Sequence, residues 1–106
     1  MKVEFEKDYL YELYKTGKTT DKKHRFQPQI VKKYVVCVKA LEDAEKIEDL
    51  FTYNALHYEK LKGEKQGRSS VRINDQYRLE FHEIVNPNNI FEIKICSLVD
   101  ITNHYK

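Results

Sequence analysis

The sequence predicts an α+β domain in which an N-terminal strand and helices pack on one face of a small, mainly antiparallel sheet. Apolar residues recur at helical spacing through the first half of the chain and alternate with polar residues through the last third. The chain has 106 residues, of which 41% are hydrophobic and 34% are charged. Because that length and composition suffice for one buried core, a single domain over residues 1–106 is expected.

A short strand and a short helix are predicted at the N-terminus. Val3 and Phe5 alternate with charged neighbours over residues 2–7, which is typical of a strand. Asp8 is the expected N-cap of the helix that follows, because its carboxylate can accept from the free N–H groups of a first turn. Gly17 is expected to end this helix, since glycine readily adopts the left-handed conformation of a C-cap.

The main helix is predicted to begin at Pro28, where a residue without an N–H costs no helical hydrogen bond. A shorter helical segment is expected over residues 43–51, with Ile47, Leu50 and Phe51 buried. The main helix carries one apolar stripe at positions i, i+4, i+8 and i+11, formed by Ile30, Tyr34, Val38 and Leu41.

The last third of the chain predicts three antiparallel strands in a meander. Polar and apolar residues alternate over residues 70–74, 77–84 and 90–99. The connecting segments 74–76 and 86–89 are rich in Asn, Asp and Pro, which favour tight turns. An N-terminal strand, helices and then a meander form the α+β arrangement.

The alternation also predicts which strand residues face the core. Successive side chains of a strand point to opposite faces, so Phe81 is expected inward. Arg72 and Arg78 then project from the face opposite the helices, or toward its rim, where a ligand could reach them. In the last strand, the same alternation places Ile95 inward and Cys96 outward.

Membrane, secreted and zinc-bound classes find no support in the sequence. No apolar run approaches the roughly 20 residues that cross a bilayer. Residues 1–10 alternate charged and apolar residues where a signal peptide would be apolar, so a cytoplasmic protein without a membrane partner is expected. Cys37 and Cys96 lie in apolar segments without a CxxC or Cys/His cluster, which predicts two reduced core thiols and no metal site.

The charge distribution is uneven although the net charge is only +2. Six cations face two acids between residues 60 and 78, whereas residues 42–49 hold five acids and one lysine. A basic segment beside an acidic one fits a phosphate-facing patch, and it equally fits a solvated face that is neutralised locally. The six cations are Lys60, Lys62, Lys65, Arg68, Arg72 and Arg78.

Residues 61–81, LKGEKQGRSSVRINDQYRLEF, carry an ordered motif. It consists of Leu61-Lys62-Gly63, a charged turn with a second glycine at position 67, a strand ending in Asn, a short turn, and the aromatic-Arg pair Tyr77-Arg78. In this pattern the chain resembles the HigB-type toxins of the RelE/ParE superfamily. The resemblance implies a RelE-like fold over residues 1–106.

The resemblance also implies a ribosome-dependent mRNA endoribonuclease, that is, an mRNA interferase of a toxin–antitoxin system. Such a toxin enters the ribosomal A site and cuts the mRNA by attack of a 2′-OH on the phosphodiester. Neither a metal nor an organic cofactor is implied. The implied partners are the mRNA on the ribosome and a helix-turn-helix antitoxin of the HigA type.

Metal-free cleavage of RNA needs a base for the 2′-OH, cations for the phosphorane charge, and an acid for the departing 5′-oxygen. Arg78 matches the family's strand arginine, and a guanidinium pairs with phosphate through two parallel hydrogen bonds. Lys62 matches the motif's lysine and is expected to hold the backbone or the transition-state charge. Three further cations and one turn residue are expected to position the RNA, namely Lys65, Arg68, Arg72 and Gln76.

The acid and base candidates depart from the family pattern. Close relatives of the HigB type carry a His two positions before the Leu-Lys-Gly, where this chain has Glu59. His57 stands two residues upstream, on the same side if the segment is extended, so either residue is a candidate base. The family's last strand ends in an Asp-aromatic-His cluster. Here Asp100 is present, but His104 and Tyr105 follow an inserted Ile-Thr-Asn.

Two alternatives to the nuclease remain open at the level of sequence. One is a ParE-like toxin that binds DNA gyrase and cuts no RNA. The other is a catalytically decayed module that still pairs with its antitoxin. This alternative stays open because Glu59 stands where close relatives carry a His.

Overall fold

A computed structural model describes residues 1–52 and 54–103 of the chain. The α-helices within these ranges are α1 (Asp8–Thr16), α2 (Pro28–Asp43) and α3 (Glu48–Phe51), and three 3₁₀ turns are η1 (Lys22–His24), η2 (Asn54–Leu56) and η3 (Gly63–Lys65). The strands are β1 (Lys2–Phe5), β2 (Glu59–Lys60), β3 (Arg68–Arg72), β4 (Tyr77–Asn86) and β5 (Asn89–Asn103).

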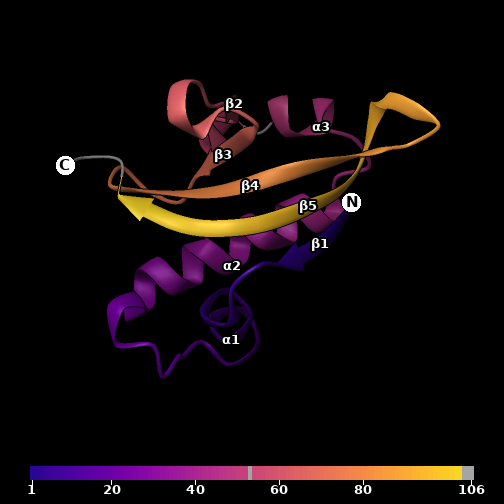
Figure 1. Ribbon diagram of the computed structural model, residues 1–106. Coiled ribbons are helices and arrows are strands. Elements are labelled where there is room, and N and C mark those ends of the chain that lie inside the picture. The colour runs from indigo at the N-terminus through magenta and orange to yellow at the C-terminus, as the bar shows by residue number, and fades with distance from the viewer. Residues whose placement is uncertain (53, 104–106) are drawn as a thin grey trace.

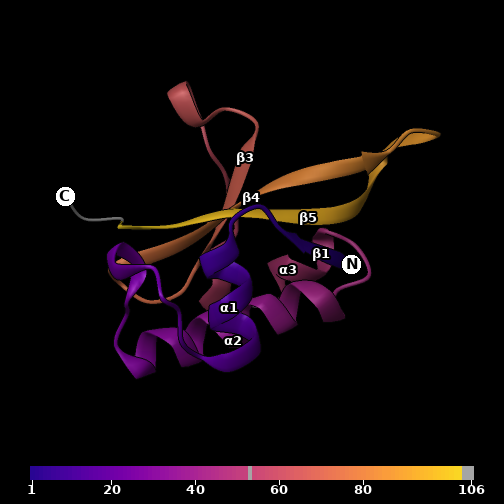
Figure 2. The same ribbon diagram turned by 60° about the horizontal axis from the view of Figure 1, so that its bottom comes forward.

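The strands of the described residues form one sheet in the order β1-β5-β4-β3-β2. β1 runs parallel to β5, and the other neighbouring strands are antiparallel. α1 and α2 lie together on one side of β4 and β5, and the turn between β2 and β3 rises on the other side (Figure 1). Figure 2 shows the same layering from a second direction. The predicted α+β fold, with helices on one face of a mainly antiparallel sheet, is confirmed.

The core lies between the helices and the sheet. α2 buries its predicted stripe against it, and the buried Tyr34 donates its hydroxyl to the Leu10 carbonyl of α1 at 2.6 Å. Leu79 and Phe81 of β4 meet these helices from the sheet side. The helix α1 ends as predicted at Gly17, whose φ of 79° allows its N–H to reach the Leu13 carbonyl at 3.0 Å. One hydrophobic cluster therefore joins α1, α2 and the sheet.

Both cysteines lie in this core as free thiols, as expected. Burial raises the pKa of Cys37 to about 12 and that of Cys96 to about 12. No helix of the described residues is long and apolar enough to cross a membrane.

Two helix predictions are wrong in detail. Asp8 is the first residue of α1, and the extended Lys7 occupies the N-cap position without a side-chain hydrogen bond, because the chain enters the helix one residue early. Phe51 is 57% exposed and packs its ring on Tyr58 at 5.5 Å between centroids. The reason is the length of α3, since a single turn directs Leu50 to the core and leaves Phe51 on its outer side.

The inward and outward residues of β5 also differ from prediction. Cys96 is fully buried and Ile95 is not, because Ile84 pairs with Ile95 while Val85 pairs with Ile93. Lys94 is therefore an extra residue, a bulge that reverses the alternation. A second extra residue lies at Val99, between the partners of Phe81 and Glu80, and reverses it again.

Candidate nucleic-acid interface

The face of the sheet opposite α1 and α2 carries most of the predicted site residues, and we call it the polar face. Residues paired directly across antiparallel strands point to the same side, so three cross-strand rows can be read from the register. The rows are Arg72, Arg78 and Thr102; Glu59, Ser70 and Glu80; and Arg68, His82 and Ser97. A row of cations thus lies next to a row of acids and a serine.

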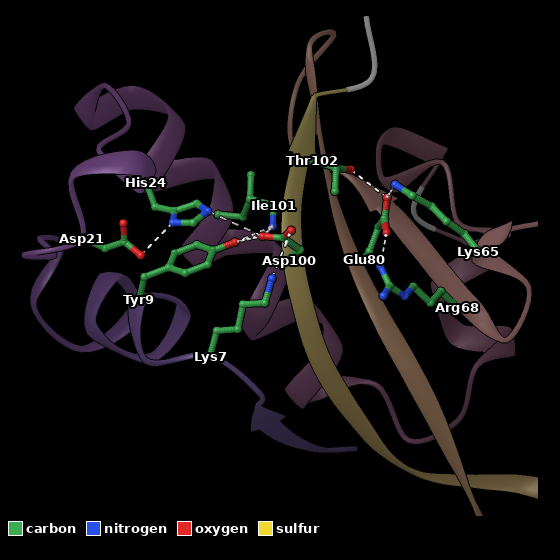
Figure 3. A network of polar contacts seen from close by, with 10 residues as sticks. All are labelled: Lys7, Tyr9, Asp21, His24, Lys65, Arg68, Glu80, Asp100, Ile101 and Thr102. Carbon is green, nitrogen blue, oxygen red and sulfur yellow. Dashed lines mark hydrogen bonds and ion pairs between the residues drawn. The ribbon is translucent and has the colours of Figure 1, made fainter. Parts of the chain in front are cut away.

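Glu80 is the centre of the polar face and is only 3% exposed. One carboxylate oxygen accepts from Lys65 Nζ at 2.6 Å and from Thr102 Oγ1 at 2.8 Å, and the other accepts from Arg68 Nη1 at 3.1 Å (Figure 3). Burial raises the pKa of the Glu80 carboxyl, but the hydrogen bonds from Lys65, Thr102 and Arg68 outweigh it and leave the pKa below its usual value. The group is therefore ionised at neutral pH.

Arg72 and Arg78 face each other across β3 and β4, and both are half-buried. The turn between the strands holds each guanidinium. Arg78 Nη1 donates to the Asn74 carbonyl at 2.9 Å, and Arg72 forms an ion pair with Asp75. Gln76 lies exposed in the same turn, where its backbone N–H donates to Asn74 Oδ1 at 2.9 Å.

Lys62 is separated from Arg78 by the register of the strands. It follows Leu61, whose N–H donates to the Arg68 carbonyl at 2.9 Å, so it lies beyond the Arg68 row and away from the Arg72 row. There it borders a groove of about 790 Å³ that reaches Val85 near the other end of β4. The structure does not bring these two motif residues together.

Glu59 and His57 have different surroundings although only one residue separates them. Glu59 is exposed on β2 and pairs with Ser70, which places it in the row next to the arginines. His57 is exposed and has a φ of 45°, in the left-handed region. The segment is not extended at His57, so the condition for the two side chains to share one side is not met.

Asp100 faces the N-terminal segment (Figure 3). The Tyr9 hydroxyl donates to the Asp100 carboxylate, Lys7 Nζ lies 3.3 Å from it, and His24 Nε2 lies 3.9 Å from it. Burial and the hydrogen bond to Asp100 raise the pKa of Tyr9. Asp100 therefore ties α1 to β5. His104 and Tyr105 lie outside the described residues.

Two features of the polar face were not predicted from the sequence. They are the burial of Glu80 and the burial of Ser70 without a hydrogen-bond partner for its hydroxyl among the described residues. Ser70 is 1% exposed, and its Oγ is the buried side-chain oxygen without a partner among the described residues. Alternation places Glu80 on the face opposite Phe81 but does not reveal that it is buried there. The only signal in the sequence was the nearby pair of cations, Lys65 and Arg68, which cover it.

Solved toxins share this fold. The chain superposes on the YoeB/ParE toxin from Agrobacterium tumefaciens with a TM-score of 0.58, at 17% identity over 99% of this chain and 100% of that one. It superposes on the YoeB-YefM complex from Staphylococcus aureus with a TM-score of 0.56, at 24% identity over 99% of this chain and 98% of that one. The chain thus has the α+β fold of the small RelE/YoeB-like toxins.

The family follows from the sequence match. The family described as "RelE-like toxin of type II toxin-antitoxin system HigB" matches residues 3–95. The chain therefore belongs to the HigB-like toxins. No protein of curated function matches the chain in sequence. Asp100 and the residues after it lie beyond the family match, which ends at residue 95.

Proposed function

We propose that the chain is a metal-independent mRNA interferase that cleaves mRNA in the ribosomal A site. The observation that carries the proposal is the pair of half-buried arginines, Arg72 and Arg78, directly opposite each other on the polar face. Like charges placed opposite each other on a sheet repel, so an anion between them is favoured. Ribosome-bound mRNA as the substrate places the reaction in the cytoplasm.

Arg78 is proposed to stabilise the phosphorane charge. One of its five N–H donors is used on the Asn74 carbonyl, which fixes the guanidinium and leaves other donors for a phosphate. Arg72, Lys65, Arg68 and Gln76 are proposed to position the RNA backbone.

Glu59 is proposed as the base that takes the 2′-OH proton. It belongs to the row next to the arginines, and its exposed carboxylate can reach a ligand lying on the polar face. His57 remains the alternative base, and Lys62 is proposed to contact RNA further along the backbone. His104 and Tyr105 are proposed as proton donors to the 5′-oxygen, since they follow Asn103, which pairs with Tyr77 next to Arg78.

The test is a cell-free translation reaction with the purified protein, followed by mapping of mRNA ends. The unmutated protein should produce ends at the A-site codon. Arg78→Ala should lower the single-turnover cleavage rate by about 10²–10³-fold, the usual cost of losing one donor to a developing oxyanion. Arg78→Lys should recover only part of the rate, because an ammonium lacks the bidentate fork. Intact mRNA with the unmutated protein would refute the nuclease.

A second outcome identifies the ParE-like alternative. If mRNA stays intact while the protein inhibits supercoiling by purified DNA gyrase, the gyrase-binding function replaces the nuclease. A protein inert in both assays that still binds its antitoxin would be a decayed module.

The proposed partner is an antitoxin, in this case a HigA-like helix-turn-helix protein. A solved structure with the same fold is a toxin in complex, the YoeB-YefM complex. Co-expression with the product of the adjacent reading frame should give one species on size-exclusion chromatography and abolish mRNA cleavage.

A further inference from the structure

We infer that Glu80 is a positioning residue for RNA cleavage, whose buried carboxylate holds Lys65 and Arg68 in place over the polar face. This inference rests on the proposed function. The ligand class it concerns is the RNA phosphodiester next to the scissile one. The observations are the three donors gathered on one carboxylate and the exposure that the two cations keep.

Glu80 holds the two cations in place while leaving most of their hydrogen-bond donors for a ligand. Lys65 donates one of its three N–H groups to Glu80 at 2.6 Å, and Arg68 donates one of its five at 3.1 Å. Their side chains are 48% and 32% exposed, whereas that of Glu80 is 4% exposed. The carboxylate is therefore covered by its partners, while the side chains of Lys65 and Arg68 stay partly exposed to solvent. Because the two long side chains are already ordered, they can hold a phosphate in the orientation that the reaction needs.

Glu80 itself is not a candidate base. Both of its oxygens accept hydrogen bonds, from Lys65, Arg68 and Thr102, and its pKa lies below the ordinary value. A ligand on the polar face meets the cations before it meets this carboxylate. The effect of Glu80 on the reaction is therefore exerted through its partners.

The network is also connected to the proposed catalytic row. Thr102, which donates to Glu80 at 2.8 Å, pairs directly with Arg78 across β4 and β5. Lys65 lies in the turn η3, between Gly63 with a φ of 70° and Gly67 with a φ of 96°. The Lys65–Glu80 ion pair thus fastens this turn to the strand that carries Arg78.

Two roles of Glu80 predict different effects of removing its charge: positioning of Lys65 and Arg68, or mere neutralisation of the local positive charge. Removing the carboxylate leaves two unpaired cations on the polar face, so RNA binding should be unchanged or tighter. If Glu80 only lowered the local positive charge, the cleavage rate would then stay the same or rise. If Glu80 positions Lys65 and Arg68, the single-turnover rate on saturated ribosomes should fall while the half-saturating toxin concentration does not rise.

The test compares Glu80→Gln with the unmutated chain on mRNA-programmed ribosomes. We expect a loss of about tenfold in the single-turnover rate, less than the roughly 10²-fold that a misplacement of about 1 Å can cause. Glu42→Gln is the matched control. Glu42 lies on α2, on the other side of the sheet, and its carboxylate accepts the Tyr14 hydroxyl at 2.6 Å. This substitution removes the same charge at a distance from the polar face, so its rate should match that of the unmutated chain.

A second variant keeps the test decisive if Glu80→Gln does not fold. Lys65→Met changes a half-exposed side chain and should lower the rate by a similar factor. In the double variant the two losses should not multiply, because both substitutions break the same ion pair. An unchanged or faster rate in E80Q, or fully multiplicative losses, would overturn the positioning role. Absence of cleavage by the unmutated chain would instead overturn the proposed function.

Discussion

His57 has a backbone φ of 45°, whereas Glu59 lies in the extended strand β2 opposite Ser70. For a non-glycine residue the left-handed region is uncommon, and here it turns the chain just before the strand begins. Histidine has the more suitable pKa for a base at neutral pH, but a base must first lie within reach of the proton that it removes. The position on the polar face therefore makes Glu59 the better candidate for the base.

Single substitutions should separate these two residues. Glu59→Gln keeps the size and hydrogen bonding of the side chain but removes the basic group, and it should lower the single-turnover cleavage rate by about 10²–10⁴-fold. His57→Gln should lower it by less than the Glu59 change. The measurement is cleavage of ribosome-bound mRNA, with the folded state of each variant checked by circular dichroism. The opposite order of effects would make His57 the base.

At the scale of elements, Tyr9 gives α1 a polar connection to the sheet in addition to its core packing. The buried Tyr9 donates its hydroxyl to Asp100 and accepts the Ile101 N–H at 2.8 Å, and its ring stacks on His24 at 3.7 Å between centroids. At this point β5 has passed the end of β1, so the hydroxyl replaces the strand partner that the Ile101 N–H lacks.

Tyr9→Phe should destabilise the protein by about 1–3 kcal/mol, because it removes a buried hydroxyl that donates to Asp100 and accepts from the Ile101 N–H. The Ile101 N–H would keep only its longer bond to Asp100 Oδ1, at 3.1 Å. Equilibrium urea unfolding is the measurement. Tyr11→Phe is the control from the same helix, since Tyr11 is 50% exposed and loses only a solvated hydroxyl. Equal unfolding midpoints for the two variants would show that the bond to Ile101 adds nothing.

Elements were predictable from sequence where their periodicity extends over several turns or strand residues. The stripe of α2 and the alternation of β4 fixed both elements and their buried faces. β2 has two residues and carries no period, and the bulges at Lys94 and Val99 leave no mark in an alternating pattern. Short elements and inserted residues are determined by pairing with neighbours, which a local pattern does not contain.

The candidate site was predictable to a similar extent. The motif located the cations, and their common face follows from alternation along β3 and β4. The pairing of Lys65 with Glu80 was not predictable, because it depends on how η3 folds back over the sheet. The separation of Lys62 from Arg78 was also not predictable from the sequence, since it depends on the register between β2 and β3.

At the scale of the whole molecule, both thiols report on global unfolding. Cys37 and Cys96 lie in the shared core, and burial raises the pKa of each to about 12. The reactive thiolate is therefore scarce in the folded state at pH 8.

Iodoacetamide at pH 8 should modify neither cysteine at an appreciable rate in the native protein, and should modify both rapidly in urea. Mass spectrometry of the intact chain and of its peptides gives the rate at each site. If the core opens as one unit, the two rates in low urea should be equal. Faster modification of one cysteine would indicate a local opening of α2 or of β5.

The parallel pairing of β1 with residues 95–98 of β5 has a consequence for the order in which the protein is made. Among the described strands, β1 leaves the ribosome before the others, and its partner β5 leaves after them. Until β5 emerges, β1 lacks its neighbour in the sheet, and α1 and α2 lack one of the strands that they cover. Contacts between distant parts of a chain form late. The polar face is thus complete only after β5 has been synthesised, so a growing chain that lacks β5 does not present the cross-strand rows that end in Thr102 and Ser97.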